Sequence, residues 1–124
     1  MINSLPKFLS IEAALLIHHQ QITRYGGMTG LRDQTLLASA IGQAQQTYFY
    51  TSDIYQAAAQ YGFSILQNHP FLDGNKRTAM ACLLTFLALN ELPLPYTTEQ
   101  LFDWTHQVIT HQISRENLAN LLKK

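Results

Sequence analysis

The sequence predicts a compact all-α domain, and three observations support this prediction. Apolar residues recur at helical spacing through most of the chain. Residues that commonly cap helices precede several of these segments. One segment, 79–89, is apolar almost throughout. Because 124 residues suit one continuous core and no linker-like stretch divides them, we treat residues 1–124 as a single domain.

The first two predicted helices have clear starting points. Ser10 can cap a helix that stops at the glycine pair 26–27. Asp33 can cap a second helix, which is expected to end where helical periodicity is lost. That loss occurs in residues 43–52, which carry consecutive aromatic side chains. This pattern predicts an irregular loop or a small β-hairpin.

Four further helices complete the predicted fold. The third spans about residues 53–69 and the fourth about residues 75–90. Thr97 and Gln100 have the spacing of a capping box ahead of a fifth helix. Ser114 can cap a short sixth helix.

The fourth predicted helix differs from the others in its polarity. Between Ala79 and Leu89 only Thr85 is polar. A helix that is apolar on all sides is normally buried on all sides. We therefore expect it to be the central helix, with the others packed around it. Such a rigid helix would also hold the polar segment before it in a fixed geometry.

Composition narrows the expected location and the classes of partner. Eight basic and eight acidic residues give a formal net charge of zero, so no direct nucleic-acid partner is expected. The longest apolar run is too short to cross a bilayer, so no membrane association is expected. The N-terminus lacks signal-peptide features, which leaves the cytoplasm as the expected location. The single cysteine, Cys82, has apolar neighbours and is expected to be a buried thiol.

A dense polar cluster, "NHPFLDGNKRTA" at residues 68–79, precedes the apolar helix. Phe71 can bury its ring and anchor the loop. Asp73 and Gly74 form a turn pair in which the glycine can adopt positive φ. Asn75 can cap the following helix through its side-chain oxygen.

Two cations, Lys76 and Arg77, fall in the first turn of that helix. Cations are normally unfavourable at a helix N-terminus, which already carries partial positive charge. Together with free backbone N–H groups they would form a strong site for an anion such as phosphate. Asp73 could hold Mg²⁺ beside it. His69 suits a general base, because an unperturbed histidine side chain changes its charge at about pH 6.5. These residue types match transfer of a phosphate group from a nucleotide to a hydroxyl.

A simpler interpretation of the cluster remains open at this point. Residues 73–75 could be only a turn, Lys76 and Arg77 could be solvated, and His69 could merely end a helix. Outside the cluster, Arg32 and Asp33 could form a loop ion pair or support a flap. The other histidines lack metal-ligand spacing and are expected to be surface or packing residues; they are His18, His19, His106 and His111.

The segment from His69 to Arg77 resembles the signature of Fic-domain proteins, His-x-Phe-x-(Asp/Glu)-Gly-Asn-x-Arg. Lys76 stands where most Fic adenylyltransferases have glycine, which is similar to the Doc (death-on-curing) branch. Residues 24–43, 55–71 and 86–94 extend the resemblance over most of the chain.

This resemblance implies a compact Fic/Doc helical bundle and a role for each residue of the signature. His69 would deprotonate a target hydroxyl, and Asp73 would hold Mg²⁺. The nucleotide phosphates would be bound by Gly74, Asn75, Lys76 and Arg77. Residues 43–51 would form a flap that docks the target as an added strand.

The resemblance also implies a function and partners. It implies a toxin that transfers a phosphoryl group from ATP to a protein Ser/Thr hydroxyl, with elongation factor Tu as the candidate target, and arrests translation. A Phd-like antitoxin would inhibit it in trans, because the self-inhibitory motif Ser/Thr-x-x-x-Glu-Gly/Asn is absent. The only Glu-Asn pair is 116–117, and the position four residues before the Glu, where the motif requires Ser or Thr, is Gln112. Two alternatives are a Fic-type adenylyltransferase and a non-catalytic binding module. Met80 departs from the family pattern, because it stands where a polar residue is usual and borders the phosphate site.

Overall fold

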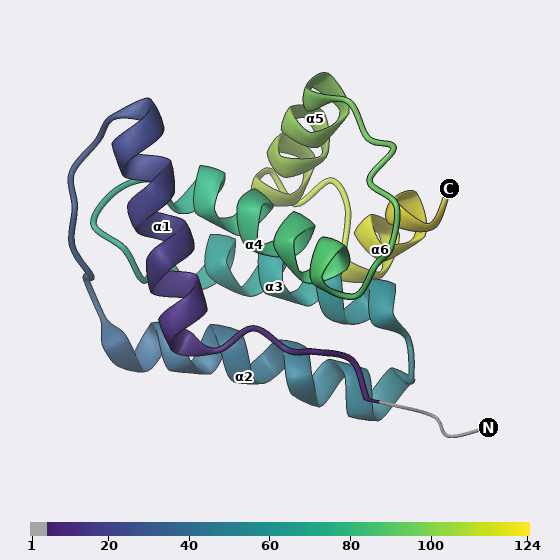
Figure 1. The fold of residues 1–124 in the computed structure, drawn as a ribbon. Coiled ribbons are helices and arrows are strands. Elements are labelled where there is room, and N and C mark those ends of the chain that lie inside the picture. The colour runs from purple at the N-terminus through teal and green to yellow at the C-terminus, as the bar shows by residue number, and fades with distance from the viewer. Residues whose placement is uncertain (1–4) are drawn as a thin grey trace.

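The computed structural model describes residues 5–124 and consists there of six helices (Figure 1). They are α1 (Ile11–Tyr25), α2 (Gln34–Thr51), α3 (Ile54–Asn68), α4 (Asn75–Leu89), α5 (Thr98–Ile109) and α6 (Arg115–Lys123). Within this part of the chain there is no strand, only an isolated antiparallel bridge between Leu31 and Phe71. None of the six helices is long and apolar enough to cross a membrane. The predicted all-α class is confirmed.

Side-chain caps begin five of the helices. Ser10, Asp33, Thr97 and Ser114 each accept a hydrogen bond from a backbone N–H in the first turn, as their spacing predicts. Asp53 does the same for α3. A cap of this kind typically contributes about 1 kcal/mol of helix stability. Most helix starts in this chain are therefore determined locally.

The start of α4 differs from the prediction. Asn75 does not cap the helix; it is the first helical residue, and Gly74 is the N-cap. Gly74 has φ of 75°, a backbone conformation that residues with a Cβ rarely adopt. Because this turn places Asn75 inside the helix, its side chain points back to the loop and bonds there to the backbone of Phe71.

The predicted loop or hairpin at residues 43–52 is wrong, because α2 continues without interruption to Thr51. Ala44 and Thr47 are buried, and Tyr48 packs edge-on against Phe8. Tyr50, two residues further, is 92% exposed. The consecutive aromatics therefore lie on different sides of one helix. Burial of the inner side of α2 stabilises the helix although the apolar periodicity of residues 43–52 is weak. The expected flap at residues 43–51 does not exist as a loop.

The central helix is α3, not α4. Nine of the fifteen residues of α3 are buried, against seven of the fifteen in α4. α3 packs against α2, α4, α5 and α6. Its alanines at 57–59 occupy little space, so helices can approach it from several sides. The apolar residues of α4 that remain half-buried, Met80, Ala81 and Leu84, line a groove.

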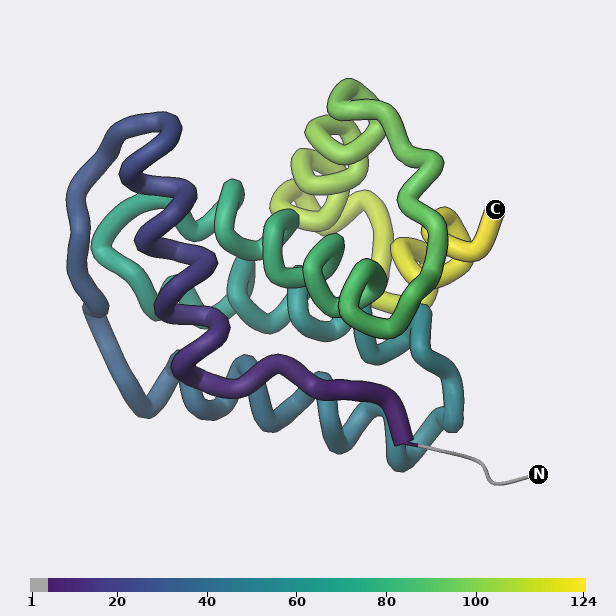
Figure 2. Tube along the Cα trace, viewed as in Figure 1, coloured from purple at the N-terminus to yellow at the C-terminus, as the bar shows by residue number. Residues whose placement is uncertain are grey.

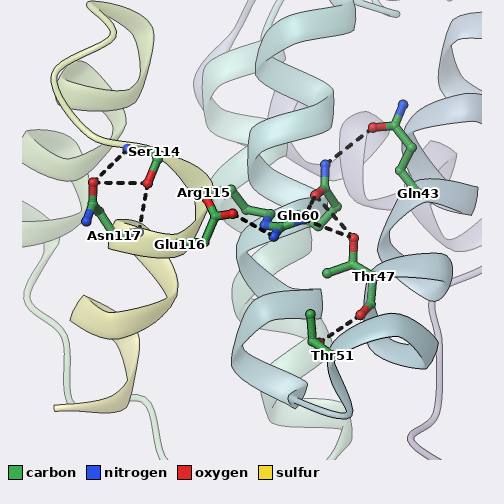
Figure 3. A network of polar contacts seen from close by, with 8 residues as sticks. All are labelled: Gln43, Thr47, Thr51, Gln60, Ser114, Arg115, Glu116 and Asn117. Atoms are coloured by element: carbon green, nitrogen blue, oxygen red, sulfur yellow. Dashed lines mark hydrogen bonds and ion pairs between the residues drawn. The ribbon is translucent and has the colours of Figure 1, made fainter.

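A polar network joins α2, α3 and α6 away from the cluster (Figure 3). Arg115 donates to Gln60 Oε1 at 2.9 Å and pairs with Glu116 at 3.0 Å. The Thr47 hydroxyl lies 3.2 Å from the same Gln60 oxygen, and the Gln60 amide donates to Gln43 at 3.3 Å. All of these residues except Glu116 also line a cavity of about 400 Å³, and the buried Arg115 Nε has no hydrogen-bond partner within residues 5–124.

Two loops meet at one end of the bundle. The loop between α1 and α2 (residues 26–33) lies beside the loop between α3 and α4 (residues 69–74), as Figure 2 shows. The Arg32 N–H donates to the Pro70 carbonyl at 2.7 Å. The segment that carries the polar cluster is therefore supported by a loop that comes much earlier in the sequence.

Candidate functional site

His69 lies at the C-terminal end of α3, where it is the C-cap. Its φ and ψ are 48° and 57°, the left-handed region that non-glycine residues rarely adopt. Its N–H still bonds to the Ile65 carbonyl at 3.1 Å, and the side chain is exposed. The turn at His69 thus ends α3 and leaves the imidazole accessible at the bundle end.

Asn75 closes the loop that follows His69. It is 6% exposed, its Oδ1 accepts from the Phe71 N–H at 3.0 Å, and its Nδ2 donates to the Phe71 carbonyl at 2.9 Å. The same Nδ2 lies 3.5 Å from His69 Nδ1, at the limit of a hydrogen bond. The side chain that the sequence assigns to phosphate binding is therefore engaged with the loop backbone.

Phe71 anchors this loop in the core, as its apolar character predicts. It is 1% exposed, and its ring stacks on the imidazole of His18 at 3.8 Å with an interplanar angle of 5°. His18 Nε2 lies 2.8 Å from the Asp73 carbonyl oxygen. A carbonyl only accepts, so His18 Nε2 is the donor. Burial lowers the pKa of His18, which favours the neutral ring.

Sequence reasoning assigned no function to His18, although its spacing held a signal. Ala14, His18 and Ile22 recur every four residues, and all three are buried on one side of α1. A polar ring at that position needs a partner, because an unpaired buried polar group is costly. Periodicity alone could therefore have placed His18 inside, but not against the Asp73 loop.

Asp73 is exposed and ionised under ordinary conditions. Its Oδ2 accepts from the Met28 N–H at 3.0 Å, and its Oδ1 accepts from the Gly74 N–H at 2.8 Å. These two bonds, with a smaller contribution from the Arg77 charge, lower the pKa of Asp73. A Cβ at Gly27 would lie 2.8 Å from Asp73 Oδ2, so glycine is required there. The carboxylate is held in place and charged, as a metal ligand must be.

The two cations of the cluster have different surroundings. Lys76 is exposed and has no hydrogen-bond or ion-pair partner within residues 5–124. Arg77 is half-buried and donates to the carbonyls of Gly26 at 2.9 Å and Gln21 at 3.4 Å. Its guanidinium also lies 5.8 Å from the centre of the Tyr25 ring. Arg77 thus ties α4 to the end of α1, and Lys76 is the cation free to meet a ligand.

A groove of about 640 Å³ runs beside the site, between α1, α4 and α5. Lys76 and Met80 line it one helical turn apart on α4, so Met80 does border the cation. Apolar residues of α5 form the opposite wall, including Phe102, which is 67% exposed. The apolar side chains of α4 therefore face two places: some are buried in the core, and others line this groove.

Arg32 and Asp33 belong to two different helix ends. Asp33 caps α2, with Oδ1 accepting from the Leu36 N–H at 3.0 Å. Arg32 reaches across to α3, where its Nε donates to the His69 carbonyl at 2.7 Å and its Nη2 to the Asn68 carbonyl at 2.8 Å. The sequence suggested an ion pair or support for a flap, and neither describes these contacts.

Comparisons with a family model and with known proteins agree on one family for this chain. Residues 8–87 match the family described as Fic/DOC. The chain is 32% identical over 120 residues to "Protein kinase doc" of Escherichia phage P1, which covers 95% of this chain and 94% of that protein. It is 34% identical over 101 residues to "Toxin Doc" of Mycolicibacterium smegmatis, which covers 77% of each chain. The match to the family includes the whole polar cluster.

Proposed function

Because the chain belongs to the Fic/DOC family, we propose that it is a toxin that transfers the γ-phosphoryl group of ATP to a Ser/Thr hydroxyl of a protein. The observation that carries this proposal is the position of Lys76. It is a cation without a partner among residues 5–124, and it lies in the first turn of α4, where free backbone N–H groups already favour an anion. A phosphate chain is the ligand that such an arrangement suits.

His69 is the proposed general base. In the proposed step, the target hydroxyl gives its proton to a ring nitrogen of His69 and its oxygen bonds to the γ-phosphorus. The bond from that phosphorus to the β–γ bridging oxygen breaks, and ADP leaves. The exposure of His69 at the end of the bundle supports this role, because a protein substrate must reach the ring.

Asp73 is the proposed Mg²⁺ ligand. Its low pKa and fixed carboxylate fit a hard cation. No group of three or more His, Cys, Asp or Glu side chains within residues 5–124 is placed to hold a metal. Mg²⁺ would therefore arrive with the ATP phosphates, supply charge neutralisation to them, and take one carboxylate from the protein.

Asp73→Asn is expected to weaken binding of ATP by about tenfold when Mg²⁺ is present and to change it little when EDTA is present. The amide removes the negative charge but keeps the size of the side chain. Calorimetric titration with ATP, with and without Mg²⁺, measures both values. Asp103→Asn, on the exposed part of α5, is the matched control. An unchanged dependence on Mg²⁺ in Asp73→Asn contradicts the assignment.

Phosphoryl transfer and adenylyl transfer require opposite orientations of the nucleotide. The long side chain of Lys76 occupies space that glycine would leave open, and its ammonium suits the inner phosphates. Binding there would turn the terminal phosphate toward His69. Alignment of reacting groups can lower a barrier by about 7–11 kcal/mol in favourable cases, so the other orientation should react far more slowly. The relative from Escherichia phage P1 is named a protein kinase, which supports the same choice.

ATP labelled on the γ-phosphate is expected to label a protein in bacterial lysate, and ATP labelled on the α-phosphate is not. Parallel reactions with equal specific activity, followed by gel separation and identification of the labelled protein, make this comparison. Elongation factor Tu is the proposed target, and its modification would arrest translation in the cytoplasm. Label from the α position alone would replace phosphoryl transfer by adenylyl transfer. Absence of label from both would favour a non-catalytic binding module.

An antitoxin acting in trans is the proposed partner. One relative is named a toxin, and the groove beside Lys76 leaves apolar side chains of α4 and α5 uncovered. An amphipathic helix of a Phd-like antitoxin would cover Met80, Leu84 and Phe102 and block access to the phosphate site. Co-expression with the product of the neighbouring reading frame tests this, since continued growth arrest would count against that product as antitoxin.

A further inference from the structure

We propose that Arg32 is a positioning residue for His69: its guanidinium fixes the backbone turn that directs the imidazole out of α3. This inference rests on the proposed function, in which His69 takes the proton. Arg32 lies 37 residues before His69 and outside the polar cluster. It touches none of the reacting groups, so its effect would pass through the backbone of His69.

The contacts of Arg32 follow three successive carbonyls at the end of α3. Its Nη2 donates to Asn68 at 2.8 Å, its Nε donates to His69 at 2.7 Å, and its backbone N–H donates to Pro70 at 2.7 Å. The last carbonyls of a helix have no partner within the helix and carry partial negative charge. A guanidinium is suited to this position, because it offers two parallel donors and a positive charge.

His69 requires such support because of its backbone conformation. Its φ of 48° lies in the left-handed region, which non-glycine residues adopt uncommonly and at some cost in free energy. The following residue is Pro70, whose ring removes the N–H that could otherwise stabilise the turn. The carbonyl of His69 itself is bonded by Arg32 Nε. If this bond is lost, the peptide after His69 can rotate and the imidazole moves with it.

Arg32 is free for this task. It forms no ion pair with a carboxylate among residues 5–124, and the neighbouring Asp33 is engaged at the start of α2. Its backbone is fixed next to the antiparallel bridge between Leu31 and Phe71. The side chain therefore starts from a rigid point and spans two adjacent carbonyls. Lysine could reach only one of them, so Arg32→Lys is not a conservative change here.

The expected result for Arg32→Ala is a fall in kcat of about 10–100-fold with the KM for ATP within about twofold of the wild type, because a small displacement of a reacting group has effects of this size. The kcat of Arg32→Lys should lie between those of Arg32→Ala and the wild type. Guanidinium chloride at low millimolar concentration should restore part of the kcat of Arg32→Ala, because the ion can occupy the exposed site of the deleted group. It should not restore His69→Ala. Arg24→Ala, at the exposed end of α1, is the matched control.

Nuclear magnetic resonance of the histidine rings separates this inference from the proposed function. The His69 ring signal, assigned by its loss in His69→Ala, should shift or broaden in Arg32→Ala, and the signal of exposed His106 should not. An unchanged His69 signal, or a kcat within about twofold of the wild type, overturns the positioning role. If the wild type transfers no label from ATP, the proposed function fails, and the ring signal still decides whether Arg32 positions His69.

Discussion

His69→Ala is expected to abolish transfer from ATP and growth arrest while leaving the helical fold intact. The imidazole is the only proposed acceptor for the hydroxyl proton, and a positioned general base typically contributes about 10²–10⁴-fold in rate. The ring is exposed, and its contact with Asn75 is at the limit of hydrogen bonding, so its removal costs little packing. Alanine also has to adopt the left-handed turn, as histidine does.

Three measurements establish this result. Growth after induction and label transfer in lysate report function, and circular dichroism during thermal unfolding reports the fold. His19→Ala is the matched control, since His19 is an exposed histidine on α1, next in sequence to buried His18. If cells that express His69→Ala stop growing as early as those with the wild type, His69 is not the base.

Phe71→Ala is expected to lower the free energy of unfolding by about 3–5 kcal/mol, the usual cost of removing a buried aromatic side chain. Phe71 is 1% exposed and stacks on His18. Alanine would leave a cavity below the loop and would leave the His18 ring without its stacking partner. Since domains of this size are stable by only about 5–15 kcal/mol, much of the stability would be lost.

Urea unfolding followed by circular dichroism measures this loss. Phe102→Ala is the matched control, because Phe102 is 67% exposed and its replacement is expected to change stability by about 0.5 kcal/mol or less. Phe71→Leu, which keeps most of the apolar volume, should lose less than Phe71→Ala. A loss below about 1 kcal/mol in Phe71→Ala would show that the loop is not anchored through this ring.

The contrast between α2 and α4 explains which fold predictions failed. The aromatics at residues 48–50 looked unlike a helix because their apolar periodicity is weak. They are helical because Ala44 and Thr47 are buried against the rest of the bundle. The apolar residues of α4 suggested burial on all sides, whereas Met80 and Leu84 line a groove. An apolar side chain indicates that water is unfavourable around it, and it does not indicate what will cover it.

In the candidate site, too, some features could be predicted from the sequence and others are visible only in the structure. The cluster at residues 68–79 is continuous in the sequence, so a chemistry could be proposed for it without a structure. The engagement of Asn75 and Arg77 with backbone carbonyls could not be inferred, because their partners depend on how the loop and α1 pack. The contacts of Arg32 and His18 with this loop were not predicted, because no short motif contains either residue.

The sequence by itself determined most helix boundaries, the all-α class and the identity of the polar cluster. Caps, turns and short motifs act between residues a few positions apart, so their physics is visible in the order of the residues. Only the tertiary structure decided that α3 is central, that α2 has no flap, and that Arg32 and His18 hold the loop. The support of the loop depends on contacts between residues 36 and 55 positions apart, Arg32 with Asn68 and His18 with Asp73. The packing of α2 on α3 depends on contacts closer in the sequence, such as Thr47 with Gln60, 13 positions apart. Such contacts form only when the helices pack, and the packing depends on the whole chain at once.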